Sequence, residues 1–281
     1  MTHVLTFVAA DLPLLDAFLE SLGLGPHKWL KAGKAADILV SSKPDRELIA
    51  RLREACAVPR VDFFVNERAT RRKKLVLADM DSTTIAEETL DELAAYAGIK
   101  DQIAAITARA MNGELDFHAA LRERVALLKG LPEAALAETP ARMKVNVGAA
   151  EFIKAMADSG AQCILVSGGF TFFTGAVASS VGFHGHHGNT LLIEDGKLTG
   201  MVGEPILDKD SKLAYLKDYA AKLGISLEET LTIGDGANDL PMLKAAGLGI
   251  GYYPKKAVAD EVDSLIGYGD FTAALYAQGL C

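Results

Sequence analysis

The hydrophobic and polar positions follow two different patterns along the chain, and each pattern predicts its own kind of fold. In the first part, short apolar runs that suit strands alternate with segments whose apolar residues recur at helical spacing. The expected elements are strands at 4–8 and 61–65, helices at 12–22 and 46–56, and a hairpin within 28–40 that turns near Gly33. This order predicts a small α+β domain over residues 1–70, followed by a solvated basic linker at 68–74.

From residue 75 onward, apolar strands alternate with helical segments, which is typical of a parallel sheet covered by helices. The strand candidates are 75–78, 163–166, 231–233 and 248–250. A long helical stretch within 86–145 separates the first two strands; it is too long for a loop and predicts a helical cap over the strand ends. A hairpin is expected at 190–201. We therefore expect an α/β protein with a Rossmann-like parallel sheet over 71–281.

Two carboxylates, Asp79 and Asp81, directly follow the first of these strands. Ligands of open α/β sheets bind at the carboxyl ends of the strands, and alternate side chains of an extended segment face the same way. Both carboxylates can therefore address one small volume, where they repel each other unless a cation or a shared proton intervenes. A pair of solvated acids in a loop is the common alternative, but the apolar strand before them favours a functional site.

Three further segments carry candidate chemistry. Ser167 and Gly168 follow the second strand, where a glycine lets a ligand approach the backbone closely. Lys212 lies at the beginning of a helical segment, and Asp235 and Asp239 flank a turn after the third strand. Carboxylates so placed suit a hard cation such as Mg²⁺. Each signal is weak alone, because a simple turn, a solvated lysine or a helix cap would look the same.

Taken together, the segments resemble the motifs of the haloacid-dehalogenase superfamily of aspartyl-phosphate phosphatases. In chain order they are Asp-x-Asp-x-Thr at 79–83, Ser-Gly-Gly at 167–169, Lys212, and Gly-Asp-Gly-x-Asn-Asp at 234–239. Within the superfamily the chain resembles the phosphoserine phosphatase family, because Glu88 and the segments 111–117 and 124–128 also follow that family's pattern. The resemblance covers roughly residues 74–265.

The resemblance implies a chemical role for each motif residue. Asp79 would attack phosphorus and form an aspartyl-phosphate, and Asp81 would protonate the departing oxygen and later deprotonate water. The residues implied to hold Mg²⁺ are Asp79, Asp81 through its backbone carbonyl, and Asp235. Asp239 and Asn238 would orient these ligands, and Asn238 would also contact the substrate. The groups implied to neutralise the phosphoryl oxygens are Lys212, Ser167 and the amide of Gly168.

The substrate implied by the resemblance is O-phospho-L-serine, hydrolysed to L-serine and phosphate in the last step of serine biosynthesis. Glu88 would bind the ammonium group and Arg124 the carboxylate, while Met111 and Phe117 would form an apolar lid in the cap. Each has a plainer alternative: the first turn of a helix, a solvated helix face, or the core of the cap. The nearest rival function is a phosphatase or phosphotransferase for another small phosphorylated metabolite.

The first 70 residues fit a ferredoxin-like module and resemble regulatory domains of the ACT type, which bind amino acids. L-serine sensing on the one hand, and homodimerisation or simple packing on the other, stay open as equal alternatives for this domain. A rival of a different class is a sensing protein with a vestigial catalytic domain. The complete set of motif residues disfavours that rival.

Composition limits the partners and the compartment. The net charge of −8 over 281 residues argues against a nucleic-acid partner, and an anionic substrate then needs local cations. Three scattered cysteines favour a reducing compartment without disulfides. Without a basic leader or a long apolar run, we expect a cytoplasmic protein with no membrane partner. The His184–His187 segment is expected to form an exposed loop and not a zinc site.

Overall fold

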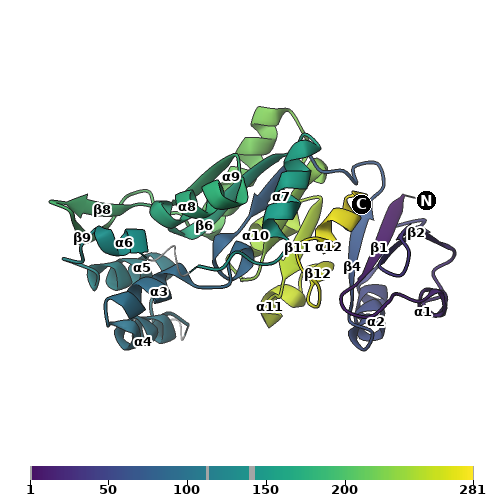
Figure 1. Cartoon of the computed structure of the whole chain (residues 1–281), viewed down its shortest axis with the longest axis horizontal. Helices are drawn as coiled ribbons and strands as arrows, with labels where there is room; N and C mark the ends of the chain where they lie inside the picture. The colour runs from purple at the N-terminus through teal and green to yellow at the C-terminus, as the bar shows by residue number, and fades with distance from the viewer. Residues whose placement is uncertain (1, 112–113, 139–142, 281) are drawn as a thin grey trace.

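The computed structural model describes residues 2–111, 114–138 and 143–280, whose main strands form one long mixed sheet (Figure 1). Its strands are β1 (His3–Ala9), β2 (His27–Lys31), β3 (Ala35–Val40), β4 (Val61–Glu67), β5 (Leu75–Ala78), β6 (Gln162–Phe170), β7 (Gly185–Asn189), β10 (Thr230–Gly234), β11 (Leu248–Tyr252) and β12 (Ser264–Ile266). They pair in the order β2-β3-β1-β4-β12-β11-β10-β5-β6-β7. Pairing is antiparallel from β2 to β4 and parallel from β12 to β7. One antiparallel pairing, Leu265 with Phe63, joins the two parts.

The antiparallel part, here called the N-terminal part (residues 2–70), confirms the predicted strands, helices and hairpin. Its helices are α1 (Asp16–Ser21) and α2 (Arg46–Ala57), and Gly33 turns the β2–β3 hairpin with φ of +68°. Because strand side chains alternate, Leu5 and Phe7 of β1 pack with the two helices. Val8 faces the other way and belongs to the core that includes α12 (Ala273–Ala277).

The parallel part has helices on both faces, which confirms the predicted Rossmann-like arrangement. Val76 and Ala78 of β5 lie in the core with α7 (Ala149–Asp158) and α8 (Thr171–Val181). Leu75 and Leu77 lie in a separate core with α9 (Lys209–Leu223) and α10 (Leu240–Ala245). The shorter elements near β10 to β12 are a 3₁₀ helix (Leu227–Glu229) and α11 (Lys256–Ala259).

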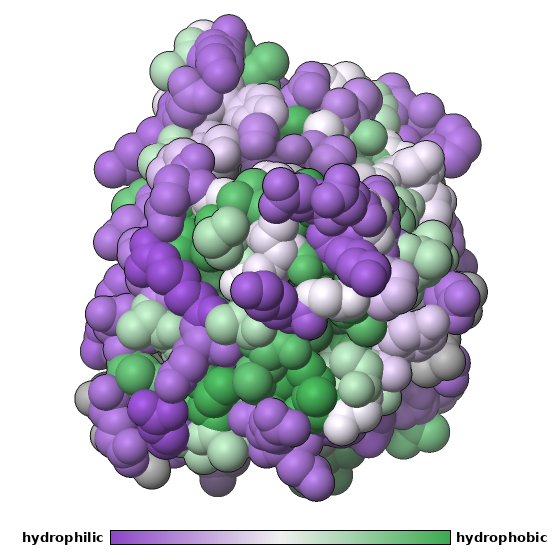
Figure 2. Space-filling view, turned by 90° about the vertical axis from the view of Figure 1, so that its left-hand side faces the viewer, coloured by the Kyte–Doolittle hydropathy of each residue, from purple (hydrophilic) through white to green (hydrophobic). Residues whose placement is uncertain are grey.

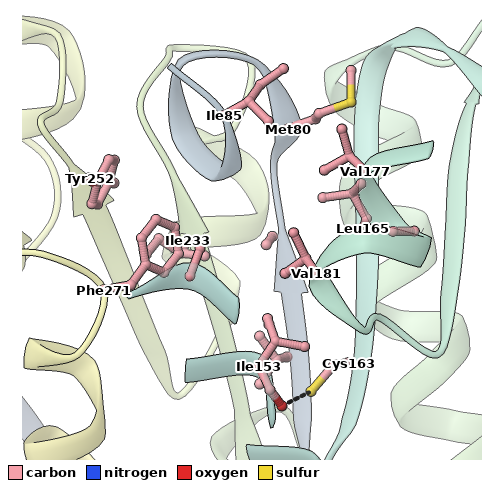
Figure 3. Close-up of a cluster of buried hydrophobic side chains, with 14 of the residues drawn as sticks. Met80, Ile85, Ile153, Cys163, Leu165, Val177, Val181, Ile233, Tyr252 and Phe271 are labelled. Atoms are coloured by element: carbon pink, nitrogen blue, oxygen red, sulfur yellow. Dashed lines mark hydrogen bonds between the residues drawn. The ribbon is translucent and has the colours of Figure 1, made fainter. Parts of the chain in front are cut away.

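Figure 3 shows the first of these cores, in which side chains from the sheet and from two helices interdigitate. Of the β6 residues, Leu165 points toward Val177 of α8, and Cys163 points toward Ile153 of α7. The Cys163 thiol lies 3.9 Å from the Ile153 carbonyl oxygen, and burial raises its pKa to about 12. This cysteine is therefore a small core residue without reactive character.

The cap is built from two insertions, of which the sequence pattern predicted only the first as part of a cap. The helices of the first are α3 (Thr89–Tyr96), α4 (Lys100–Met111), α5 (Phe117–Ala126) and α6 (Ala134–Glu138). The second is the predicted hairpin, β8 (Leu191–Glu194) and β9 (Lys197–Val202). Gly130 donates to the carbonyl of Leu198 at 2.8 Å, and Leu198 donates to that of Leu131 at 2.9 Å. The hairpin is thereby fastened to the helices.

The cap lies at one end of the long axis, and the two chain termini lie toward the other (Figure 1). Figure 2 looks onto the cap end, where apolar patches are surrounded by hydrophilic side chains. Among the described helices, none combines the length and the apolar character of a membrane-crossing segment.

The expectation of a solvated linker at 68–74 is wrong for two of its residues. Lys73 is buried and donates from Nζ to the carbonyl of Glu228 at 2.7 Å. Arg71 donates to Asp37 and to the carbonyls of Tyr276 and Ala277. The physical reason is that the two parts share one sheet, so the connecting segment is packed between them and does not cross open solvent.

The expectation of an exposed loop at His184–His187 is right for the exposure of His184 and His186 but wrong for the loop, because residues from Gly185 onward form the edge strand β7. Strand alternation sends His186 to Thr174 on one face, at 2.8 Å, and His187 to Tyr219 on the other, at 2.9 Å. The rings therefore diverge. Within the described ranges, the group of side chains placed to share a metal ion contains no histidine.

Candidate active site

Asp79 lies directly after β5, at the carboxyl end of the parallel part of the sheet. Its side chain is buried, and Oδ1 accepts hydrogen bonds from the Met80 N–H and from Lys212 Nζ, both at 2.8 Å. Lys212 enters from the first turn of α9 and also contacts Asp239 Oδ1 at 2.6 Å. One buried ammonium thus holds two buried carboxylates.

The pKa values of Asp79 and Lys212 both lie above their usual values. Burial and the neighbouring Asp239 raise the pKa of Asp79 well above its usual value, although Lys212 opposes them. Burial alone would lower the pKa of Lys212, but the two carboxylates raise it above its usual value. The lysine is therefore a permanent cation in the site.

A sharp turn after Asp79 brings Asp81 to the same cavity. The turn is a single π-type turn (η1, Met80–Thr84), in which Ser82 has φ of +53°, a region uncommon for residues with a side chain. The Thr84 hydroxyl stabilises the turn by donating to the Asp79 carbonyl at 2.5 Å. Both carboxylates line one cavity as a result.

Asp81 is held by groups from two different elements. Its Oδ1 accepts the Thr89 N–H of cap helix α3 at 2.8 Å, and its Oδ2 accepts the Ser167 hydroxyl of β6 at 3.1 Å. Burial, followed by the charge of Glu88, raises the pKa of Asp81 to about 6. A Cβ at position 169 would lie 2.9 Å from Asp81 Oδ2, so a larger residue than Gly169 would displace this carboxylate. A carboxyl group with this pKa can both give and take a proton near neutral pH.

Three buried carboxylates are placed to share one cation. Asp79, Asp235 and Asp239 each offer an oxygen, and these oxygens lie within 4.8 Å of one another. Asp235 directly follows β10, which pairs in parallel with β5, so the two strand ends bring it beside Asp79. Asp239 is fixed by the Gly236 N–H, which donates to its Oδ2 at 3.0 Å. Buried carboxylate oxygens that exceed the nearby positive charge fit a hard divalent cation.

The cavity in front of these groups, of about 210 Å³, lies between the strand ends and the cap. The predicted site residues that line it are Asp79, Asp81, Glu88, Phe117, Arg124, Ser167, Gly168, Asp235 and Asn238. Lys212 contacts Asp79 but does not line this cavity; it lines an adjoining cavity of about 570 Å³. Met111 ends α4, and its side chain lies outside the described part of the chain.

The cap supplies charged and apolar groups that face the acids. Glu88 accepts a hydrogen bond from the Ser82 hydroxyl at 2.7 Å. Arg124 donates from Nε to the Ala120 carbonyl at 3.2 Å, and burial lowers its pKa while Glu88 opposes this. Phe117 is 41% exposed, and the tip of its ring lies 3.6 Å from where a Cβ on Gly168 would stand. The roof of the cavity thus carries both signs of charge.

Sequence reasoning missed two residues of the site. Thr89 contributes its backbone N–H to Asp81, and its position at the start of a helix is the signal that could have indicated a free N–H group. Lys255 contacts Asp235 Oδ2 with Nζ at 3.0 Å. It follows the fourth predicted strand closely, and that position was the available signal.

Comparisons with known proteins agree with this geometry. Residues 76–244 match the family model described as haloacid dehalogenase-like hydrolase. A phosphoserine phosphatase from Streptococcus thermophilus is 46% identical over 66% of this chain and 86% of its own length. A phosphoserine phosphatase from Archaeoglobus fulgidus is 40% identical over 78% of this chain, and the chain spans only 64% of that relative's length.

The fold as a whole also has a counterpart among solved structures. The crystal structure of a HAD family hydrolase from Salmonella enterica subsp. enterica serovar Typhi superposes with a TM-score of 0.88. The alignment covers 98% of both chains at 32% identity, so it includes the N-terminal part and the cap. With the matched family model covering more than half of its residues, this chain belongs to the haloacid dehalogenase-like hydrolase family.

Proposed function

We propose that the protein hydrolyses O-phospho-L-serine to L-serine and phosphate through an aspartyl-phosphate on Asp79. The observation that carries the proposal is one cavity that holds both halves of the chemistry. Strand-end groups suited to phosphoryl transfer form one wall, and cap groups suited to an amino acid, Glu88 and Arg124, form the other. Matches to relatives named phosphoserine phosphatase support this assignment.

In this mechanism Asp79 Oδ attacks phosphorus as the bond to the seryl oxygen breaks. The hydrogen bonds from Met80 N–H and Lys212 orient the carboxylate for the attack. Asp81 gives its proton to the departing seryl oxygen and then accepts a proton from the water that hydrolyses the aspartyl-phosphate. Its pKa of about 6 suits both steps.

Charge on the phosphoryl oxygens is neutralised by Lys212, the Ser167 hydroxyl and the Gly168 amide. The residues that would hold Mg²⁺ are Asp79, the Asp81 backbone carbonyl and Asp235, with Asn238 and Asp239 orienting them. The ion would supply further positive charge beside the transferring group. The excess of buried carboxylates over ammonium groups supports this assignment.

Substrate selection lies in the cap. Glu88 binds the ammonium group and Arg124 the carboxylate, while Phe117 covers the cavity and excludes water. Met111 is the other residue that the family resemblance implies for this role. A substrate without the amino-acid groups would still reach Asp79 but would lose both contacts. The distinction between phosphoserine and other phosphomonoesters therefore rests on these two charged residues.

We also propose a division of the chain into an ACT-like domain at 1–70 and a phosphatase domain at 71–281, with the main cap segment at 86–145. The first domain is a candidate for an L-serine effector site or for a homodimer contact. Calorimetric titration of the full chain with L-serine, together with its mass in solution, tests both. No heat beyond that of active-site product binding, and a monomeric mass, would reject both.

The activity itself is tested by phosphate release from purified protein. We expect turnover of O-phospho-L-serine with Mg²⁺, none after chelation, and a higher kcat/KM than for phosphothreonine, phosphoethanolamine or a sugar phosphate. If another phosphomonoester has the highest kcat/KM, the substrate assignment is wrong. If no substrate releases phosphate with Mg²⁺, the enzymatic assignment itself is wrong.

A further inference from the structure

Lys255 lies at the meeting point of the active-site cavity and a second hollow. It lines the active-site cavity beside Asp235. It also lines a neighbouring hollow of about 680 Å³, whose other walls include Asp11 and Lys34 of the N-terminal part. A single lysine thus borders both the proposed chemistry and a region whose role that chemistry does not explain.

The contact between Lys255 and Asp235 involves both side chain and backbone. Lys255 Nζ lies 3.0 Å from Asp235 Oδ2, and the Lys255 N–H donates to the Asp235 carbonyl at 3.0 Å. Asp235 is buried and is one of the three carboxylates that can share a cation. Lys255 is therefore placed to offset part of the negative charge of that group.

The N-terminal part holds the chain before Lys255 through a loop. Tyr253 has φ of +40°, an uncommon conformation for a residue with a side chain. Its hydroxyl donates to the carbonyl of Gly269 at 3.0 Å. The carboxylate of Asp62, on β4, accepts the N–H groups of Gly267, Tyr268 and Gly269 at 2.8, 3.1 and 2.8 Å. Asp62 thereby fixes the loop against which Tyr253 rests.

The N-terminal part also holds the chain after Lys255. Helix α11 begins directly after this residue. Arg53 of α2 donates to the carbonyl of Ala259, the last residue of α11, at 2.5 Å, and also to the carbonyl of Val262. The segment that carries Lys255 is therefore fastened at both ends by side chains of the N-terminal part.

We propose that Lys255 is a positioning residue of the active site and that the N-terminal part keeps it against Asp235 through Arg53 and Asp62. The ammonium group reduces the negative charge that an anionic substrate meets. By the same Coulomb interaction it weakens the hold of the carboxylates on a divalent cation. Loss of this lysine should therefore change the two affinities in opposite directions, which a purely structural role would not do.

The first test is Lys255→Met, which keeps the length of the side chain and removes its charge. We expect calorimetric titration with Mg²⁺ to give a Kd about threefold to tenfold lower. The KM for O-phospho-L-serine should rise by about the same factor, with kcat little changed. Lys255→Arg should restore both values. Unchanged affinities, or weaker binding of both Mg²⁺ and substrate, would overturn the proposal.

The second test asks whether the N-terminal part acts through Lys255. Arg53→Met and Asp62→Asn should each lower the Kd for Mg²⁺ in the parent chain but add little in the Lys255→Met background. The matched control is Asn66→Ala, which removes a 3.0 Å hydrogen bond from the N-terminal part to the Ala277 carbonyl of α12. Equal effects in both backgrounds, or the same effect from Asn66→Ala, would overturn the coupling.

The inference rests on the divalent-cation site of the proposed function, but not on phosphoserine. Titration with Mg²⁺ uses no substrate, and p-nitrophenyl phosphate can replace phosphoserine in the KM measurement. A failure of the substrate assignment therefore leaves these tests intact, whereas a failure of the Lys255 assignment leaves phosphoserine hydrolysis unaffected.

Discussion

Two groups of charged side chains, buried wholly or in part, lie beside the same sheet, and they differ in how far their charges balance. In the N-terminal part, Asp37 accepts two hydrogen bonds from the guanidinium of Arg71, at 2.6 and 2.9 Å. Thr6 donates to the same carboxylate at 2.8 Å, and Arg71 also reaches two carbonyls near the end of α12. We call these three residues the structural cluster. One negative and one positive charge compensate each other within it.

The other group consists of Asp79, Lys212, Asp235 and Asp239, which we propose to be catalytic and call the catalytic cluster, and its charges do not balance. Three buried carboxylates face one buried ammonium group, with Lys255 reaching in from the surface. A balanced cluster is complete within the chain, whereas an unbalanced one is costly until a cation joins it. Burial of charges that are not compensated, more than burial of charge as such, therefore distinguishes a reactive site from a purely structural cluster.

The largest effect should come from removing Asp79, the proposed nucleophile of the catalytic cluster. In Asp79→Asn the amide cannot attack phosphorus, and we expect kcat to fall by more than about a thousandfold. The thermal midpoint should not fall, because one of three crowded carboxylates loses its charge. Phosphate release and thermal unfolding measure the two. Activity near that of the parent would show that another group attacks.

The structural cluster should respond in the opposite way. Asp37→Ala leaves the half-buried guanidinium of Arg71 without its carboxylate, and we expect a loss of about 2 kcal/mol in the free energy of unfolding. Turnover per folded molecule should stay close to the parent value. Urea unfolding measures this loss. The variant Thr6→Val, whose free energy of unfolding we expect to fall by about 1 kcal/mol, provides the reference for its size. A loss of turnover without a loss of stability would give Asp37 a functional role.

Substrate recognition by the cap should be separable from the catalytic cluster. Arg124→Ala should raise the KM for O-phospho-L-serine about tenfold to a hundredfold, because a charge-assisted contact to the carboxylate is lost. The KM for p-nitrophenyl phosphate should hardly change. Arg122→Ala is the matched control, since Arg122 lies on the same helix and pairs with Glu204 at 2.5 Å, away from the cavity. Equal effects on both substrates would exclude carboxylate recognition.

The smallest effect concerns Lys73, a buried cation outside both clusters. Burial lowers its pKa from 10.5 to about 8, so the folded protein releases this proton at lower pH than the unfolded chain does. The stability of the parent should therefore rise with pH above pH 8, relative to Lys73→Met. Below that pH the variant should be at least as stable. Urea unfolding at about pH 7 and about pH 9.5 checks the sign. A constant difference would mean that Lys73 titrates as an exposed lysine.

The strands and the motif residues of the site could be predicted because their signals are local. The apolar run 75–78 is bounded by a basic segment and by two acids, so both its ends were visible in the sequence. Alternation along that strand then divides its residues between the two cores. Asp79, Asp81 and Asp235 were placed together by one rule, the meeting of parallel strands at their carboxyl ends.

The features that sequence reasoning missed depend on contacts between distant residues. The pairing of Leu265 with Phe63, which makes one sheet of two parts, leaves no local pattern. Lys255 and Lys256 are neighbours of the same type, yet one contacts Asp235 and the other pairs on the surface with Asp260 at 2.8 Å. The turn before them, where Tyr253 has φ of +40°, has a backbone conformation that no periodicity in the sequence indicates.

The packing of α12 against the first strands has a consequence for biosynthesis. Val8 and Phe64 share their core with Ala274 and Ala277, which are translated near the end of this sequence. On the ribosome, the early strands leave the exit tunnel long before their covering helix exists. One apolar face of these strands therefore stays uncovered until α12 emerges, and it should be a target for chaperones until then.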